Sequence, residues 1–306
     1  QLVCIMKNGL KNDRHHEQFS NENVSMLEPL YNEIIRGLAF AKREIENKRA
    51  ILSIKKGDML HIPVHCKYIS DHIIDYIIKN MNRQIEYRLN IGNRNLVVRF
   101  GLFDNTIALC ELEYYFHMIV SLIHTLTKYA NIKCGKTQII SIYMTKYKKT
   151  FPANLVDILG PNNCNSGFST RCIDTNEVII FRKEEWFKVL IHELFHSFGL
   201  DIDNICDNRL TQYIKVNLPI NQDVLVSESY VETWARVINV VYSAIINSSS
   251  REQFYYILRF SLKMETLFAT YQAVRILKYM KIDYTCAIDK TSLLAKKMYL
   301  EDTHIF

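Results

Sequence analysis

The amino-acid sequence predicts an α+β fold, and three observations carry that prediction. The 306-residue chain is 48% hydrophobic and 23% charged, a balance that supplies a sizeable core. Along the chain the apolar spacing changes from three- and four-residue steps to strand-like runs and back again, which indicates helices on both sides of a small sheet. Only 5 prolines and 9 glycines occur, and that scarcity argues against a disordered or many-turned all-β chain.

The first elements are two amphipathic helices. Apolar residues recur at steps of three and four over Met26–Ala50 and again over Ser70–Met81, which is the spacing of one buried helix face. The apolar faces comprise Leu30, Ile34, Leu38, Ala41 and Ile45 in the first helix, and Ile73, Ile74, Ile77 and Ile78 in the second. We therefore expect residues 1–82 to form a helical N-terminal region that packs on the domain after it.

The period then changes to that of β-strands. Two strands flank the turn at residues 92–95, and a long helix over Thr106–Tyr129 follows and backs the sheet. The expected strands are Gln84–Asn90, Leu96–Phe103, Ile139–Met144, Asn165–Thr170 and Val178–Arg182. These elements predict a small mixed sheet within a second domain, residues 83–250.

The C-terminal half is expected to be helical. The helices are Glu184–Phe198, Asp223–Asn247, Arg251–Met280 and Thr291–Tyr299. Residues 251–306 then form a C-terminal helical region.

Composition argues against several classes of protein. The 8 cysteines include no CxxC pair, so a structural zinc ribbon is not expected, and we interpret them as mostly reduced thiols of an intracellular, cytoplasmic protein. The longest uncharged apolar candidate, Tyr114–Thr127, is too short to span a membrane, and the first residues do not resemble a signal peptide. The net charge of +6 is spread along the chain, which argues against a nucleic-acid partner.

One motif carries chemistry. Residues 189–199 read VLIHELFHSFG and contain HExxH. His192 and His196 are four residues apart, so a helix places both imidazoles on one face within reach of a single ion. Glu193 can then act on a water at that ion. Gly199 stands where a helix C-cap glycine is expected.

A catalytic zinc needs a third protein ligand, and the sequence leaves alternatives open. In the metzincin pattern the ligand position falls on Ile202, which cannot bind a metal. An irregular site can use one of the nearby aspartates, which are Asp201, Asp203 and Asp207. A third arrangement uses a later helix on which Glu228 and Glu232, four residues apart, share a face. One carboxylate can then bind the metal while the other orients a liganding histidine.

HExxH followed by an ExxxE helix resembles the gluzincin branch of the zincin metallopeptidases, the thermolysin-like arrangement, and looks most like anthrax lethal factor-type sites. The likeness covers about residues 84–245. It implies a zincin-like catalytic domain and a Zn²⁺ cofactor, with His192, His196 and Glu228 as ligands. It also implies Glu193 as general base and Glu232 as the carboxylate that accepts the N–H of a liganding histidine and orients it. Ser227 departs from the Asn usual in thermolysin-like enzymes.

The same resemblance implies a substrate. Residues 165–169 would form an edge strand that pairs with an extended peptide or protein substrate. No residue matches the family's oxyanion-stabilising group, and Tyr213, Tyr230 and Arg236 are the candidates. The alternative function is a structural or partner-binding protein with a zincin fold and little or no activity. A large DNA virus or an AT-rich parasite would suit this composition, and a viral protein of this kind would be virion-associated. The oligomeric state is left open.

Overall fold

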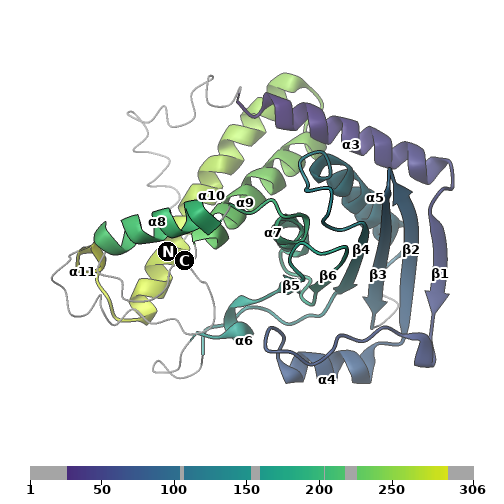
Figure 1. The fold of residues 1–306 in the computed structure, drawn as a ribbon, viewed down its shortest axis with the longest axis horizontal. Helices are drawn as coiled ribbons and strands as arrows, with labels where there is room; N and C mark the ends of the chain where they lie inside the picture. The colour runs from purple at the N-terminus through teal and green to yellow at the C-terminus, as the bar shows by residue number, and fades with distance from the viewer. Residues whose placement is uncertain (1–25, 104–106, 153–158, 203, 218–225, 289–306) are drawn as a thin grey trace. The chain divides into compact units, whose positions relative to one another are not determined.

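The computed structural model describes residues 26–103, 107–152, 159–202, 204–217 and 226–288, with the backbone alone at 204–207, 217, 287 and 288 (Figure 1). Contacts divide the chain into two compact units. One unit holds the described residues of 36–214 and 226–235, and the other holds those of 26–35, 215–217 and 236–288. The sheet and the HExxH motif both belong to the first unit.

One mixed sheet of six strands organises the first unit. Its strands are β1 (Ile51–Lys55), β2 (Arg83–Ile91), β3 (Arg94–Leu102), β4 (Thr137–Tyr143), β5 (Gly167–Ser169) and β6 (Thr175–Ile180). They lie in the order β1-β2-β3-β4-β6-β5. Strands β3, β4 and β6 are parallel to one another, whereas β1, β2 and β5 join by antiparallel pairs. Strand β5 therefore lies at one edge of the sheet.

Helices pack on both faces of the sheet, whose three parallel strands are largely buried. On one face, Phe116 of α5 (Leu109–Leu126) stacks on Tyr87 of β2 with ring centroids 4.4 Å apart. On the other face, α4 (Asp71–Asn80) buries three isoleucines in a cluster with Tyr143 and Ile179. Helix α7 (Trp186–Phe198) packs beside β5 and β6 (Figure 1).

The remaining elements are helical. They are α3 (Glu28–Glu46), the single-turn η2 (Gly57–Met59), α6 (Pro161–Cys164), α8 (Asn204–Asn217), α9 (Val226–Ile246), α10 (Arg251–Tyr279) and α11 (Tyr284–Ile288). In the second unit, Tyr31 of α3 packs against Phe254 of α10 with ring centroids 4.5 Å apart. The hydroxyl of Tyr255 also donates to Glu28 there, at 2.6 Å.

A buried ion network ties the first three strands together. Glu86 of β2 is 1% exposed, and it accepts hydrogen bonds from Lys55 of β1 at 2.7 Å and from Arg99 of β3 at 2.8 Å. Arg88 donates to its second oxygen at 2.8 Å. Burial alone would raise the pKa of Glu86, but these three cations outweigh it and lower the pKa to about 2.

The predicted α+β class is confirmed, since helices accompany one mixed sheet in the described part of the chain. Each helix and strand expected up to residue 280 is present, most within three residues of its expected ends. The sequence did not predict β1, α8 or the short helices η2, α6 and α11, and the expected helix Thr291–Tyr299 lies outside the described residues. Among those residues no helix is both long and apolar enough to cross a membrane. The division of the chain at residues 82 and 250 stays a prediction.

Candidate metal centre

The HExxH helix is held by apolar burial on most of its surface. Nine of its residues are buried, among them Val189, Leu190 and Leu194. The helix ends at Gly199, whose φ of 64° is the left-handed conformation that glycine adopts without strain. Leu200 then donates its backbone N–H to the carbonyl of Phe195 at 2.9 Å, which turns the chain back along the helix end.

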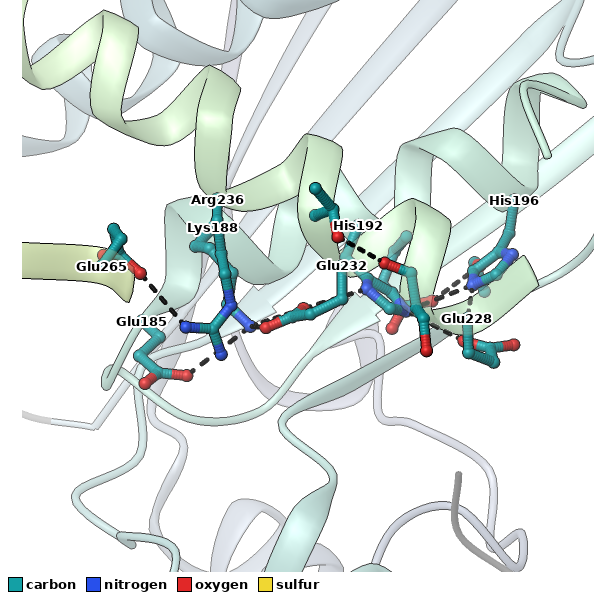
Figure 2. A network of polar contacts seen from close by, with 12 residues as sticks. Glu185, Lys188, His192, His196, Glu228, Glu232, Arg236 and Glu265 are labelled. Atoms are coloured by element: carbon teal, nitrogen blue, oxygen red, sulfur yellow. Dashed lines mark hydrogen bonds and ion pairs between the residues drawn. The ribbon is translucent and has the colours of Figure 1, made fainter. Parts of the chain in front are cut away.

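His192 and His196 of α7 meet Glu228 of α9 (Figure 2). The two Nε2 atoms are 3.2 Å apart, and each lies 3.3 Å from Oε2 of Glu228. These are the three residues that can share one metal ion among the described residues. All three side chains are largely buried, with 19%, 7% and 14% of their surfaces exposed.

The dimensions of this triangle fit a tetrahedral metal ion. Ligand atoms about 2.0–2.1 Å from a zinc ion, at tetrahedral angles, lie about 3.3 Å from one another. The three atoms of the cluster therefore form one face of such a tetrahedron. Two imidazoles and one carboxylate also make up a donor set typical of catalytic zinc, which leaves the fourth position for water or substrate.

A second carboxylate lies behind His192. Oε2 of Glu232 is 3.3 Å from Nδ1 of His192, on the ring edge away from the cluster. Lys188 holds Glu232 in place, because its ammonium group donates to both carboxylate oxygens at 2.9 and 3.0 Å (Figure 2). This 3.3 Å ion pair, which does not have hydrogen-bond geometry, places negative charge behind the ring whose Nε2 faces Glu228.

Asp201 takes the same place behind His196. Its Oδ2 lies 2.9 Å from Nδ1 of His196, not beside Nε2. The alternative in which Asp201 is the third ligand is thus not the arrangement seen here, where Asp201 orients a histidine. Asp203 and the side chain of Asp207 lie outside the described residues. The sequence placed Asp201 near the site but did not indicate this role.

Glu193 points toward the edge strand. The hydroxyl of Ser169, the last residue of β5, donates to Oε2 of Glu193 at 2.8 Å. Glu193 is 8% exposed and follows His192 directly in the helix. The edge strand and the expected general base are therefore in contact.

The carboxylates around the imidazoles favour positive charge at the centre. Burial alone would lower the pKa of His192, but its contacts with Glu228 and Glu232 raise the pKa to about 9. The pKa of His196 is likewise raised to about 10 by Asp201 and Glu228, against the effect of burial. Burial would raise the pKa of Glu228, yet the two histidines hold it well below its usual range. The site thus attracts cations, and a metal ion must displace protons to bind.

A disulfide lies against the end of the HExxH helix. Cys134 and Cys172 are bonded, so one pair departs from the reduced state that the sequence indicated for most of the cysteines. The described cysteines Cys66, Cys110, Cys164 and Cys286 are free. A Cβ atom added at Gly199 would lie 3.2 Å from Sγ of Cys134 and 3.3 Å from Sγ of Cys172.

The loops joined by this disulfide cap the helix. The last carbonyls of an α-helix lack partners within it. Here Cys172 donates its backbone N–H to the carbonyl of His196 at 3.3 Å, and Asn131 donates to that of Phe198 at 3.1 Å. The side-chain amide of Asn176 donates to the carbonyl of Ser197. Three successive carbonyls at the metal-centre end of α7 are thus satisfied from outside the helix.

Arg171 is a site residue that the sequence did not indicate. Its guanidinium donates to Oε1 of Glu228 at 3.2 Å, across 57 residues of sequence. Of the expected oxyanion candidates, Arg236 pairs with Glu265 at 3.1 Å and Tyr230 packs edge-on against Trp234. Tyr213 is 69% exposed on α8. An oxyanion role stays a prediction for each of them.

Comparisons with known proteins found no relative of this chain, so any function must be argued from the geometry of the site. No protein-family model matches the chain, and no significant match was found among curated proteins or among solved structures.

Proposed function

We propose that this chain is a zinc-dependent peptidase of the gluzincin type. The single observation that carries the proposal is the triangle of Nε2, Nε2 and Oε2 atoms from His192, His196 and Glu228, with sides of 3.2–3.3 Å. Glu193 next to that triangle supplies the base that hydrolysis needs. A metal site for structure alone would not need this buried carboxylate, and structural zinc usually has four protein ligands where three described residues are brought together here.

Each residue then has a defined part in hydrolysis. His192, His196 and Glu228 would hold the ion, while Glu232 and Asp201 orient the two imidazoles. Zinc in this place supplies a Lewis acid that activates water and polarises a carbonyl. Glu193 accepts the proton of the attacking water and passes it to the leaving amine. Ser169 holds the Glu193 carboxylate in position through its hydrogen bond.

The edge strand supports a peptide substrate. Strand β5 is the last strand of the sheet and, among the described strands, pairs only with β6, so its other edge is where an extended peptide could add. A peptide added there would lie beside Ser169, and therefore beside Glu193. The proposed substrate is accordingly an extended segment of a peptide or protein.

The proposed location of the enzyme is inside the cell. Four of the six described cysteines are free, which fits a reducing compartment. Cys134 has no exposed surface, so burial shields its disulfide from reductants. Cell fractionation with antibody detection tests the location.

A cleavage assay tests the activity. The wild type and Glu193→Gln are loaded with zinc, their zinc content is measured, and both are incubated with a peptide library. We expect equal zinc content, with cleavage by the wild type and essentially none by the variant. Equal cleavage by both proteins would overturn the assignment of Glu193. Absence of cleavage by a zinc-loaded wild type would favour the alternative, a zincin-fold partner-binding protein.

A further inference from the structure

We propose that Arg171 selects substrates that carry a carboxylate close to the scissile bond. This inference rests on the proposed peptidase function and names the class of substrate. The carboxylate belongs to an acidic side chain or to the C-terminus of the peptide, and the same guanidinium recognises both.

The chain leaving β5 presents alternate side chains to the metal centre. In an extended segment, residues two apart point to the same side. Ser169 contacts Glu193 and Arg171 contacts Glu228. Thr170 between them points elsewhere, since its hydroxyl lies 3.3 Å from Oδ1 of Asn176 and its N–H bonds Glu177. One side of residues 169–171 therefore faces both the base and a candidate metal ligand.

The position of Arg171 is fixed by its neighbours. Thr170 donates to the carbonyl of Glu177 at 3.0 Å, and Cys172 is bonded to Cys134 and donates to the carbonyl of His196. The backbone on both sides of Arg171 is therefore anchored to β6 and to the HExxH helix. The anchored backbone keeps the start of the Arg171 side chain beside Glu228, so substrate binding costs side-chain but little backbone conformational entropy.

Arg171 is available to a substrate. Its side chain is 65% exposed, whereas that of Glu228 is 14% exposed. Among the described residues Glu228 is its one polar partner, at a single 3.2 Å contact. A guanidinium has five N–H donors in a planar fork that matches a carboxylate, so most of this capacity is unused. A cation at Oε2 of Glu228 would share the negative charge of that group and weaken its hold on Arg171.

The distance suits a residue next to the cleaved bond. Arg171 donates to Oε1 of Glu228, whereas Oε2 of Glu228 faces the histidines. If a zinc ion were bound to Oε2, the donating nitrogen of Arg171 would lie within about 7.5 Å of that ion. Successive residues of an extended peptide rise about 3.3 Å. A carboxylate on one of the two residues flanking the scissile bond can therefore reach the guanidinium.

Matched peptides test the proposal. The starting point is a peptide that the zinc-loaded wild type cleaves. It is synthesised in versions with Gln, Glu or Lys at each of the two positions that flank the scissile bond, and the C-terminus of each version is amidated. A fourth form keeps Gln and has a free C-terminal carboxylate just beyond the bond. We expect the wild type to favour a carboxylate-bearing form over the Gln form by about 10- to 100-fold in kcat/KM, as for a charge-assisted hydrogen bond. The favoured form tells whether a side chain or the C-terminus supplies the group.

Variants complete the test. Arg171→Ala should lose the preference, and Arg171→Glu should reverse it toward the Lys peptide, with zinc content and melting temperature recorded for each. Lys183→Ala is the matched control, since Lys183 is also an exposed cation of this unit, 54% exposed, and its ammonium group pairs among the described residues only with Glu111, at 3.9 Å. Its preference should equal that of the wild type.

The outcomes separate this inference from the function on which it rests. Cleavage by the wild type without a carboxylate preference, or a preference that survives in zinc-loaded Arg171→Glu, overturns the role of Arg171 alone. A zinc-loaded wild type that cleaves no peptide overturns the peptidase proposal and this inference with it.

Discussion

Asp201 Oδ2 lies 2.9 Å from Nδ1 of His196, on the ring edge opposite the nitrogen that faces Glu228. Glu232 lies on the corresponding side of His192, where its Oε2 forms a 3.3 Å ion pair with Nδ1 and no hydrogen bond. Each imidazole of the pair thus has a carboxylate behind it and Glu228 in front of it. This arrangement fixes both rings with Nε2 toward a common point and makes them more basic ligands.

We expect Asp201→Ala to weaken zinc binding by about 10- to 100-fold without abolishing it, because the orientation of His196 is lost but no ligand is removed. Competition with a chromophoric chelator measures the dissociation constant. Asp174→Ala is the control, since Asp174 is 63% exposed and pairs only with Lys136 among its described contacts. An unchanged affinity would contradict the orienting role, whereas loss of zinc at saturation would make Asp201 a ligand.

The two glutamates of α9 should respond differently. Glu228→Ala removes the oxygen that lies 3.3 Å from both Nε2 atoms, so we expect no stoichiometric zinc after dialysis. Glu232→Ala leaves the triangle intact and should retain zinc with an affinity about 10- to 100-fold weaker. Metal analysis of the dialysed proteins distinguishes the two variants. The reverse pattern would exchange the roles of the two residues.

Local patterns in the sequence predicted the part of the site that lies on regular helices. The i,i+4 spacing placed His192 with His196 and Glu228 with Glu232, because helix geometry fixes which residues share a face. The place of Asp201 behind His196 could not be predicted from the sequence, which left it open as an alternative ligand, since its direction depends on the left-handed turn at Gly199. Arg171 was missed because its contact with Glu228 joins a loop and a helix far apart in sequence.

The missed elements have weak patterns for physical reasons. Strand β1 has Ile51, Leu52 and Ile54 exposed at the sheet edge, so its apolar residues do not alternate with polar ones. Helix α8 is mostly exposed where its side chains are described and lacks a continuous apolar face. The spacing of apolar residues reveals an element only when one side of it is buried, and neither β1 nor α8 has such a side.

The disulfide should stabilise the fold around the metal centre. We expect Cys134→Ser with Cys172→Ser to lower the free energy of unfolding by about 2–4 kcal/mol, the usual contribution of a native disulfide. Urea unfolding in the presence of a chelator measures this without a contribution from metal. Wild type that is unfolded, reduced with a dithiol and refolded in the presence of the dithiol should match the double variant, whereas Cys110→Ser, at a free exposed cysteine, should not change stability. Equal stability of oxidised and reduced wild type would contradict this role.

Glu86 should make the stability of the sheet depend on acid. Its pKa is lowered from the ordinary 4.5 to about 2 in the folded chain, so the folded state favours the ionised form. That stabilisation, about 3 kcal/mol, is present above pH 4.5 and is lost as the pH falls toward 2.

The variant Glu86→Gln isolates this effect. It should be less stable than the wild type by about 3 kcal/mol at pH 7, because three cations lose their buried partner, and the difference should shrink below pH 4.5. Glu46→Gln is the control, since Glu46 is 63% exposed and has only a 3.8 Å pair with Lys42, and its effect should stay below about 0.5 kcal/mol. Urea unfolding at several pH values measures both. A difference that does not change with pH would refute the charge-based account.

The most direct measurement of the central claim is X-ray absorption at the zinc edge of the full chain loaded with one equivalent of zinc. The account expects two imidazole nitrogens with carboxylate and water oxygens at about 2.0–2.2 Å, and no sulfur at about 2.3 Å. His196→Ala should lose this spectrum, while Glu193→Gln should retain it. A sulfur shell, or a spectrum that is the same in His196→Ala, would contradict the assignment of the metal centre to His192, His196 and Glu228.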